Sequence, residues 1–210
     1  MDATLIAYTD KSAFDAGVAA LSGTTQILNF DNLSDGFLIK DGDTVGGITF
    51  NYDFGGVEMM VSNEFDTTSS PNFLGTNDAD VFQDGDSFDL SFSPINAIGM
   101  YFITTDELWD NDITLKVGTF EVPLVSADEQ GLLSNDYVFF LGVIDDMNTF
   151  SSASVVADSG EPSPVFLYNV DDITTAETMP IPEPSSFILF MIGILMMGAF
   201  IWHWKRKMIT

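Results

Sequence analysis

The strongest constraint in this sequence is an uncharged apolar run that extends from Phe187 to Trp204. As a helix, the run would measure about 27 Å, close to the roughly 30 Å hydrocarbon core of a bilayer. It ends at the basic cluster Lys205-Arg206-Lys207. A buried core helix can also be apolar on every side, but the length, the lack of charge and the cationic stop favour a membrane. We therefore expect one transmembrane helix over residues 185–204 and a basic tail over residues 205–210.

Charge is distributed unevenly along the chain. All 32 acidic residues lie at or before Glu183, and the net charge of the whole chain is −26. Basic flanks of membrane segments are retained on the cytoplasmic side. We therefore expect the basic tail to be cytoplasmic and residues 1–173 to form an extracytoplasmic domain.

Two prolines flank Glu183 just before the apolar run. Pro182 and Pro184 each lack a backbone N–H, and each disfavours helical backbone in the residue before it. We expect residues 174–184 to form an extended linker, and an exposed extended segment fits the cleft of a protease. A Pro-rich linker in front of an ordinary anchor has a similar composition, so cleavage and simple anchoring both remain open.

The order of Pro182-Glu183-Pro184, an apolar helix and Lys205-Arg206-Lys207 resembles the PEP-CTERM sorting signal of Gram-negative bacteria. Ile181 replaces the usual valine, and the basic cluster is mixed rather than arginine-rich. The resemblance implies an inner-membrane precursor and processing near the Pro-Glu-Pro motif by a membrane protease of the exosortase family. It also implies delivery to the cell surface or the extracellular medium.

The first residues do not have the pattern of an export signal. Met1 to Tyr8 has no basic n-region, and its apolar stretch is shorter than the core of a signal peptide. Ala3 to Tyr8 has the pattern of a first β-strand instead, so we expect an export signal upstream of this sequence. A misplaced start codon or insertion after translation would also explain the pattern.

Most of the domain shows the period-two alternation of β-strands, interrupted by turn residues. In residues 88–92 apolar side chains alternate with an aspartate and a serine, which indicates one buried and one solvated face. One short helix is expected after Asp10, because Phe14, Val18 and Leu21 repeat at helical spacing. About nine or ten short strands joined by polar turns predict an all-β fold, an antiparallel β-sandwich. The predicted strands span residues 25–30, 47–52, 57–61, 87–92, 97–103, 113–117, 139–143, 152–156 and 165–169.

Six short runs of the domain resemble, in this order, a domain type that recurs among PEP-CTERM proteins and is related to carbohydrate-binding modules. The resemblance implies a jelly-roll-like sandwich, although function does not follow from a fold alone. The runs are residues 8–14, 27–31, 46–50, 94–100, 139–143 and 169–173.

Composition argues against several chemistries. The chain has no cysteine, and its one histidine, His203, lies in the apolar run. We therefore expect neither a disulfide nor a zinc thiolate site, and no nucleophile activated by an imidazole base in the domain. Nucleic acid is not an expected partner, because its binding depends on basic patches. These points predict a protein that is not an enzyme.

Acidic loops suit calcium, which takes oxygen ligands from carboxylates and carbonyls. The likeness to jelly rolls suggests a structural ion that joins the first and last strands. It points to Asp31 together with Asp171 or Asp172. The alternative is that these acids are only solvated at the edges of the sheets.

Glycan binding would use an exposed aromatic ring beside polar side chains. Trp109 is the only tryptophan before the apolar run, and it lies in a polar turn between two predicted strands. It is the predicted glycan-binding residue, although a large apolar ring at the edge of the core is an equal alternative.

Two functions follow from these patterns. The favoured one is an exported, non-enzymatic protein of the cell surface or extracellular matrix, with glycans or calcium as ligands and an exopolysaccharide as partner. The alternative is a membrane-anchored glycan hydrolase with two paired carboxylates. An exposed Trp109 on a flat face would favour binding, whereas two acids across a deep cleft would favour hydrolysis.

Overall fold

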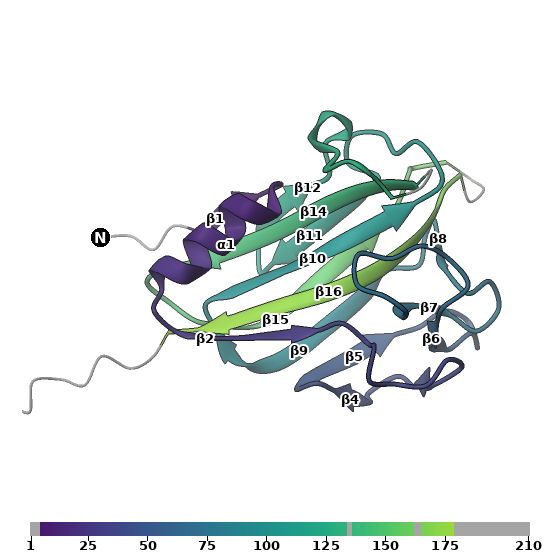
Figure 1. The fold of residues 1–210 in the computed structure, drawn as a ribbon, viewed down its shortest axis with the longest axis horizontal. Coiled ribbons are helices and arrows are strands. Elements are labelled where there is room, and N and C mark those ends of the chain that lie inside the picture. The colour runs from purple at the N-terminus through teal and green to yellow at the C-terminus, as the bar shows by residue number, and fades with distance from the viewer. Residues whose placement is uncertain (1–4, 134–135, 162–164, 179–210) are drawn as a thin grey trace, which may run out of the picture. The chain divides into compact units, whose positions relative to one another are not determined.

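Antiparallel strands dominate the computed structural model, which describes residues 5–133, 136–161 and 165–178 (Figure 1). These residues belong to a single unit. The predicted transmembrane helix, the Pro-Glu-Pro motif and the basic tail lie outside the described residues. Within the described residues, no helix is long and apolar enough to cross a membrane.

The larger sheet contains ten strands, and all its pairings are antiparallel. Seven strands follow one another in the order β1 (Leu5–Tyr8), β14 (Asp136–Asp145), β10 (Ala97–Thr104), β16 (Leu167–Glu177), β7 (Phe73–Thr76), β6 (Met59–Ser62) and β3 (Leu38–Ile39). Three more pair from the side, namely β2 (Thr24–Leu28) and β8 (Phe82–Gln83) with β16, and β13 (Leu132–Leu133) with β14.

The smaller sheet contains six strands, again all antiparallel. Their order is β12 (Phe120–Pro123), β11 (Ile113–Val117), β15 (Phe150–Ala157), β9 (Phe88–Ile95), β5 (Ile48–Tyr52) and β4 (Thr44–Val45). A short 3₁₀ turn, Ser126–Asp128, follows β12.

One apolar core joins the two sheets. Phe50 and Leu90 of the smaller sheet and Phe102 and Val170 of the larger sheet are fully buried in the same cluster. The alternation of β9 is as predicted, with Phe88 and Leu90 buried. The prediction of an antiparallel, two-sheet β protein with one N-terminal helix is therefore confirmed, whereas jelly-roll connectivity stays a prediction.

The helix α1 (Lys11–Ala20) packs on β14 of the larger sheet (Figure 1). Asp10 caps it, accepting a 2.7 Å hydrogen bond from the Ala13 N–H. The buried Phe14 ring packs against the Phe140 ring, with centroids 5.1 Å apart. It also covers Gly142, where an added Cβ would lie only 2.6 Å from the Phe14 ring. A residue without a side chain at this point of β14 lets the helix approach the sheet.

Strand β16 extends further than the sequence indicated. The predicted linker begins at residue 174, but Thr174 pairs with Ile27 of β2, and Ala176 pairs with Ala97 of β10. Residues 174–177 therefore belong to the sheet. The stretch resembles a linker because it has no aromatic residue, yet β-branched threonine suits a strand that is paired on both sides.

Candidate functional site

Trp109 lies in the connection between β10 and β11, in a turn that Asp112 closes. The Trp109 N–H donates a 2.7 Å hydrogen bond to Asp112 Oδ2, and the Asp112 N–H donates to the Trp109 carbonyl over 3.2 Å. Asn111 takes a φ of 75° between them, a left-handed conformation that asparagine tolerates. Leu108 is buried, whereas 73% of the Trp109 surface is exposed. The indole is thus presented to solvent and is not a core-edge residue.

A second aspartate, Asp110, also holds the turn that carries Trp109. Asp110 Oδ1 accepts hydrogen bonds from the Ser126 N–H and hydroxyl, at 2.8 and 3.0 Å. These two bonds lower the pKa of the Asp110 carboxyl. The backbone of the turn that carries Trp109 is therefore held at two points, by Asp112 and by Asp110.

A cavity of about 350 Å³ lies beside the indole. This volume is within the range of sites for small ligands, roughly 300–1,000 Å³. Burial raises the pKa of the Asp112 carboxyl, and the hydrogen bond from Trp109 opposes that shift. The lining residues include three carboxylates and no basic side chain. They are Glu107, Trp109, Asp112, Ser159, Glu161, Val165 and Phe166.

Of these residues, only Trp109 was predicted from the sequence to bind a ligand. Glu161 and Val165 lie in the connection between β15 and β16, more than fifty positions along the chain. Ser159 is held there by Asp84, whose Oδ1 accepts a 2.9 Å hydrogen bond from the Ser159 N–H. No local pattern in the sequence relates this connection to the Trp109 turn, because only the pairing of the strands brings them together.

Asp171 is fully buried on β16, and hydrogen-bond donors surround its carboxylate. Oδ2 accepts from the Thr67 hydroxyl and, at 2.8 and 3.0 Å, from the Ser69 N–H and hydroxyl. Oδ1 accepts from the Asp172 N–H over 2.7 Å. Burial raises the pKa of the Asp171 carboxyl to about 6, opposed by the hydrogen bond from Thr67. The Thr68 hydroxyl lies 3.0 Å from carboxylate oxygens of both Asp171 and Asp172.

Residues 67–72 form a segment that contacts Asp171 through its first residues and Asp31 through its last. Asp31 Oδ1 accepts a 3.1 Å hydrogen bond from the Asn72 N–H, and its Oδ2 accepts from Asn29 Nδ2 over 2.8 Å. Asp31, in the connection after β2, and Asp171 of β16 therefore hold residues 67–72 at opposite ends.

Calcium binding at Asp31 with Asp171 or Asp172 stays a prediction. In the part of the chain that the structure describes, no three acidic, histidine or cysteine side chains come together to hold a metal ion. Asp31, Asp171 and Asp172 bind the 67–72 segment instead, through hydroxyl and N–H donors. Simple solvation does not describe Asp171 either, because its side chain is buried.

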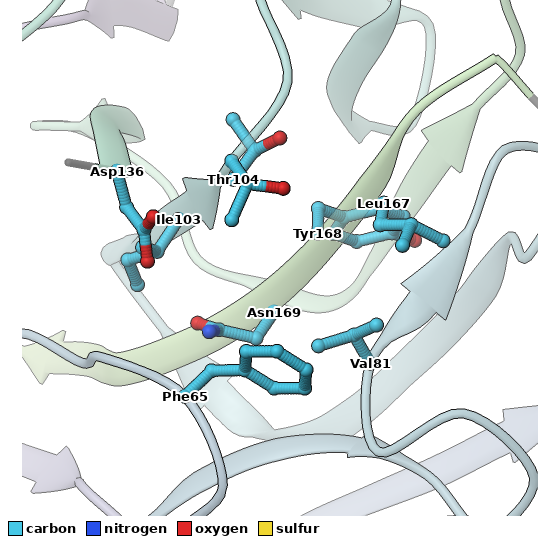
Figure 2. Close-up of a pocket in the computed structure, with 9 residues that line it drawn as sticks. Phe65, Val81, Ile103, Thr104, Asp136, Leu167, Tyr168 and Asn169 are labelled. Atoms are coloured by element: carbon cyan, nitrogen blue, oxygen red, sulfur yellow. The ribbon is translucent and has the colours of Figure 1, made fainter.

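A smaller cavity, of about 30 Å³, lies where β10 and β16 meet Phe65 of the β6–β7 connection and Asp136, the first residue of β14 (Figure 2). Asn169 lines it and is 2% exposed. Its Nδ2 donates a 3.1 Å hydrogen bond to the Asp66 carbonyl, and its Oδ1 has no hydrogen-bond partner in the described structure. Burial, with Asp66 as a second cause, raises the pKa of the nearby Asp136 carboxyl. Sequence reasoning predicted neither residue.

The predicted sorting residues Pro182, Glu183 and Pro184 and the basic cluster Lys205-Arg206-Lys207 lie outside the described residues. Residues 180–207 match a known family, the PEP-CTERM protein-sorting motif. The match covers the predicted motif, the apolar run and the basic cluster. The motif implies association with a membrane and processing by an exosortase.

Comparison of the whole chain with curated proteins and solved structures adds little to the match of the sorting motif. No curated protein matches the sequence. Among solved structures, the chain is similar to the K2 cleaved adhesin domain of Lys-gingipain, with 12% identity and a TM-score of 0.46. The similarity covers 75% of this chain and 99% of the adhesin domain. A likeness of this size supports no functional argument.

Proposed function

We propose that this chain is an exported, non-enzymatic protein of the cell surface or extracellular matrix, whose β domain binds glycans around Trp109. Its C-terminal PEP-CTERM motif serves to deliver it and to release it from the membrane. The observation that carries the delivery is the match of residues 180–207 to the sorting motif. An exposed tryptophan beside a cavity of ligand size supports the binding role.

The precursor is oriented with the β domain outside the cytoplasm. This orientation follows from the basic residues after the apolar run, because such clusters stay on the cytoplasmic side. The chain has no cysteine, so a single cysteine placed at exposed Ser152 would report on one position only. A maleimide that cannot cross membranes should label Ser152→Cys in intact spheroplasts. Labelling only after lysis would contradict the orientation.

The Trp109 cavity suits a neutral or cationic sugar. An indole face packs against the C–H surface of a pyranose ring, and carboxylates accept hydrogen bonds from its hydroxyls. Glu107 and Glu161 are exposed at the same cavity and supply such acceptors. An anionic polysaccharide would be repelled by these carboxylates and by a chain of net charge −26.

Glycan binding is tested with a panel of neutral, amino and acidic polysaccharides and the purified chain. Trp109→Ala should reduce retention on the polysaccharide that binds by at least about tenfold, which corresponds to roughly 1.4 kcal/mol. Trp109→Phe keeps an aromatic face and should lose less. Met147→Ala removes another exposed apolar side chain and serves as the matched control. Equal retention of Trp109→Ala and the parent chain would reject this site.

The alternative function is glycan hydrolysis by two carboxylates. One observation favours it, since Glu107, Asp112 and Glu161 line a single cavity. Asp112, however, already accepts the Trp109 N–H, and both glutamates are exposed to solvent. The release of reducing ends from the bound polysaccharide, lost in Glu107→Gln or Glu161→Gln, would establish hydrolysis and replace the binding role.

A further inference from the structure

The side-chain oxygen of Asn169 is buried without a hydrogen-bond partner. The 3.1 Å bond from Nδ2 to the Asp66 carbonyl fixes the orientation of the amide, so Oδ1 is the atom that lacks a partner. Buried polar atoms in native proteins are nearly always satisfied by protein groups, water or a ligand. Because Asn169 lines the cavity of about 30 Å³, a group in that cavity is the natural donor.

A second acceptor lines the same cavity. Figure 2 shows the Asp136 carboxyl group and the Asn169 amide end on the same side of the pocket. Asp66 adds a second negative charge near Asp136. None of the lining residues is basic. The cavity therefore calls for an occupant that donates hydrogen bonds and carries positive charge.

The remaining walls are mostly apolar. Val81 and Ile103 are buried, while Phe65 and Leu167 are 44% and 39% exposed. Figure 2 shows Val81 and Phe65 near Asn169, with Leu167 and Tyr168 further along β16. An occupant with an alkyl portion would bury it against these side chains, as lysine stems do on apolar surfaces.

Size narrows the choice further. A water molecule needs roughly 10–15 Å³ of cavity volume. A cavity of about 30 Å³ therefore accepts one or two groups of the size of water and excludes a sugar ring. Calcium requires six to eight oxygen ligands, which this largely apolar lining does not offer. Water alone would satisfy Asn169, but it would not offset the negative charges of Asp136 and Asp66.

We propose that this cavity binds a primary ammonium group on an alkyl chain, with the ammonium donating to Asn169 Oδ1 and to the Asp136 carboxylate. The alkyl stem lies between Phe65 and Leu167 at the mouth. The same chemistry is available from a free alkylamine and from a lysine side chain of a partner protein. This site is separate from the Trp109 cavity and does not depend on glycan binding.

The test is a titration of the full-length chain, in non-ionic detergent, with n-butylammonium chloride. The readout is the side-chain amide NMR signal of Asn169, assigned by its absence in Asn169→Leu. We expect a saturable shift. Asp136→Asn should weaken binding about tenfold, whereas Asp146→Asn, at an exposed turn, should leave it unchanged. Thermal unfolding curves of Asp136→Asn and Asp146→Asn that match the curve of the parent chain would show that both variants fold.

Three further compounds separate the effect of charge from that of shape, and a partner's lysine from a free amine. n-Butanol has the same stem without the charge and should cause no saturable shift. Tighter binding of Nα-acetyl-lysine N-methylamide than of 1,4-diaminobutane supports a partner's lysine, and the reverse supports a free amine. The proposal is overturned if n-butylammonium gives no saturable shift, or if n-butanol binds equally well, in which case water alone satisfies Asn169.

Discussion

The N–H of Trp109 donates a hydrogen bond to the Asp112 carboxylate over 2.7 Å, and this contact presents the indole to solvent. The carboxylate is mostly buried, so its interaction with the turn is shielded from water. One aspartate therefore has two roles, since it closes the turn and lines the cavity beside the ring. A substitution that disrupts this turn is therefore expected to disrupt the proposed glycan site as well.

Replacement of Asp112 by alanine should destabilise the domain and weaken glycan binding. The Trp109 N–H would lose its acceptor, and such a loss typically costs about 1–3 kcal/mol. Urea unfolding measures the first effect, and retention on the polysaccharide measures the second. Asp112→Asn keeps an oxygen acceptor at this position and should retain most of both properties. If Asp112→Ala bound glycan as the parent does, the turn would not organise the site.

The buried Asp171 should make stability depend on pH. Its pKa in the folded protein is about 6, above the ordinary 3.8, so the native state holds this proton more tightly than the unfolded state. The free energy of unfolding should therefore fall as pH rises from about 4 to about 6, and the contribution of Asp171 should level off above that. A shift of this size corresponds to about 3 kcal/mol.

Asp171→Asn isolates this contribution from that of other acids. Burial also raises the pKa of Asp86, Asp112 and Asp136, so the parent chain has several groups that act in the same direction. Urea unfolding at pH 4, 5, 6 and 7 should give a shallower fall for Asp171→Asn than for the parent. The exposed-site variant Asp146→Asn should keep the parent slope. Identical slopes for Asp171→Asn and the parent would refute a raised pKa at Asp171.

Gly142 is expected to be intolerant of a side chain. An added Cβ would lie 2.6 Å from the Phe14 ring and 2.9 Å from the Phe140 ring. Overpacking of this kind costs about 1–3 kcal/mol, so Gly142→Ala should lower the urea midpoint. The double variant Gly142→Ala/Phe14→Leu should recover part of the loss relative to the sum of the single variants. Strict additivity would show that α1 does not depend on this contact.

Local patterns in the sequence predicted much of the sandwich but not its sites. The alternation in residues 88–92 predicted the faces of β9, and Asp10 with Phe14 and Val18 predicted α1. Strands β3, β4, β8 and β13 were missed because each has only two residues and shows no period. The four-residue strands β7 and β12 were missed as well, and β7 is buried along its whole length and so shows no alternation.

The sites depend on distant segments of the chain. Trp109 was accessible to sequence reasoning because it is the only tryptophan in its region. Glu161 lines the same cavity as Trp109, and Asp136 and Asn169 line another, because strand pairing brings together segments far apart in the sequence. Calcium binding by Asp31, Asp171 and Asp172 stays a prediction for the same reason. An acidic side chain in a turn or strand does not reveal whether a metal or a hydroxyl group will face it.

Calcium should have little effect on the stability of the domain. Asp171 is already surrounded by donors from Thr67 and Ser69, and Asp31 accepts from Asn72. Thermal unfolding in millimolar CaCl₂ and after chelation should therefore give the same midpoint, because a ligand shifts stability only if it binds the native state. A clear rise of the midpoint with calcium that is lost in Asp171→Asn would contradict this prediction and show that calcium binds at Asp171.

The most direct test of the account is the intact mass of the mature protein from a host that has an exosortase. The parent chain should be shorter than its full length, with its C-terminal end near Pro182 to Pro184. The variant with Pro182, Glu183 and Pro184 all changed to alanine should keep the full-length mass and stay with the membrane fraction. A full-length mass for both chains would contradict the sorting role and leave the apolar run as a plain anchor.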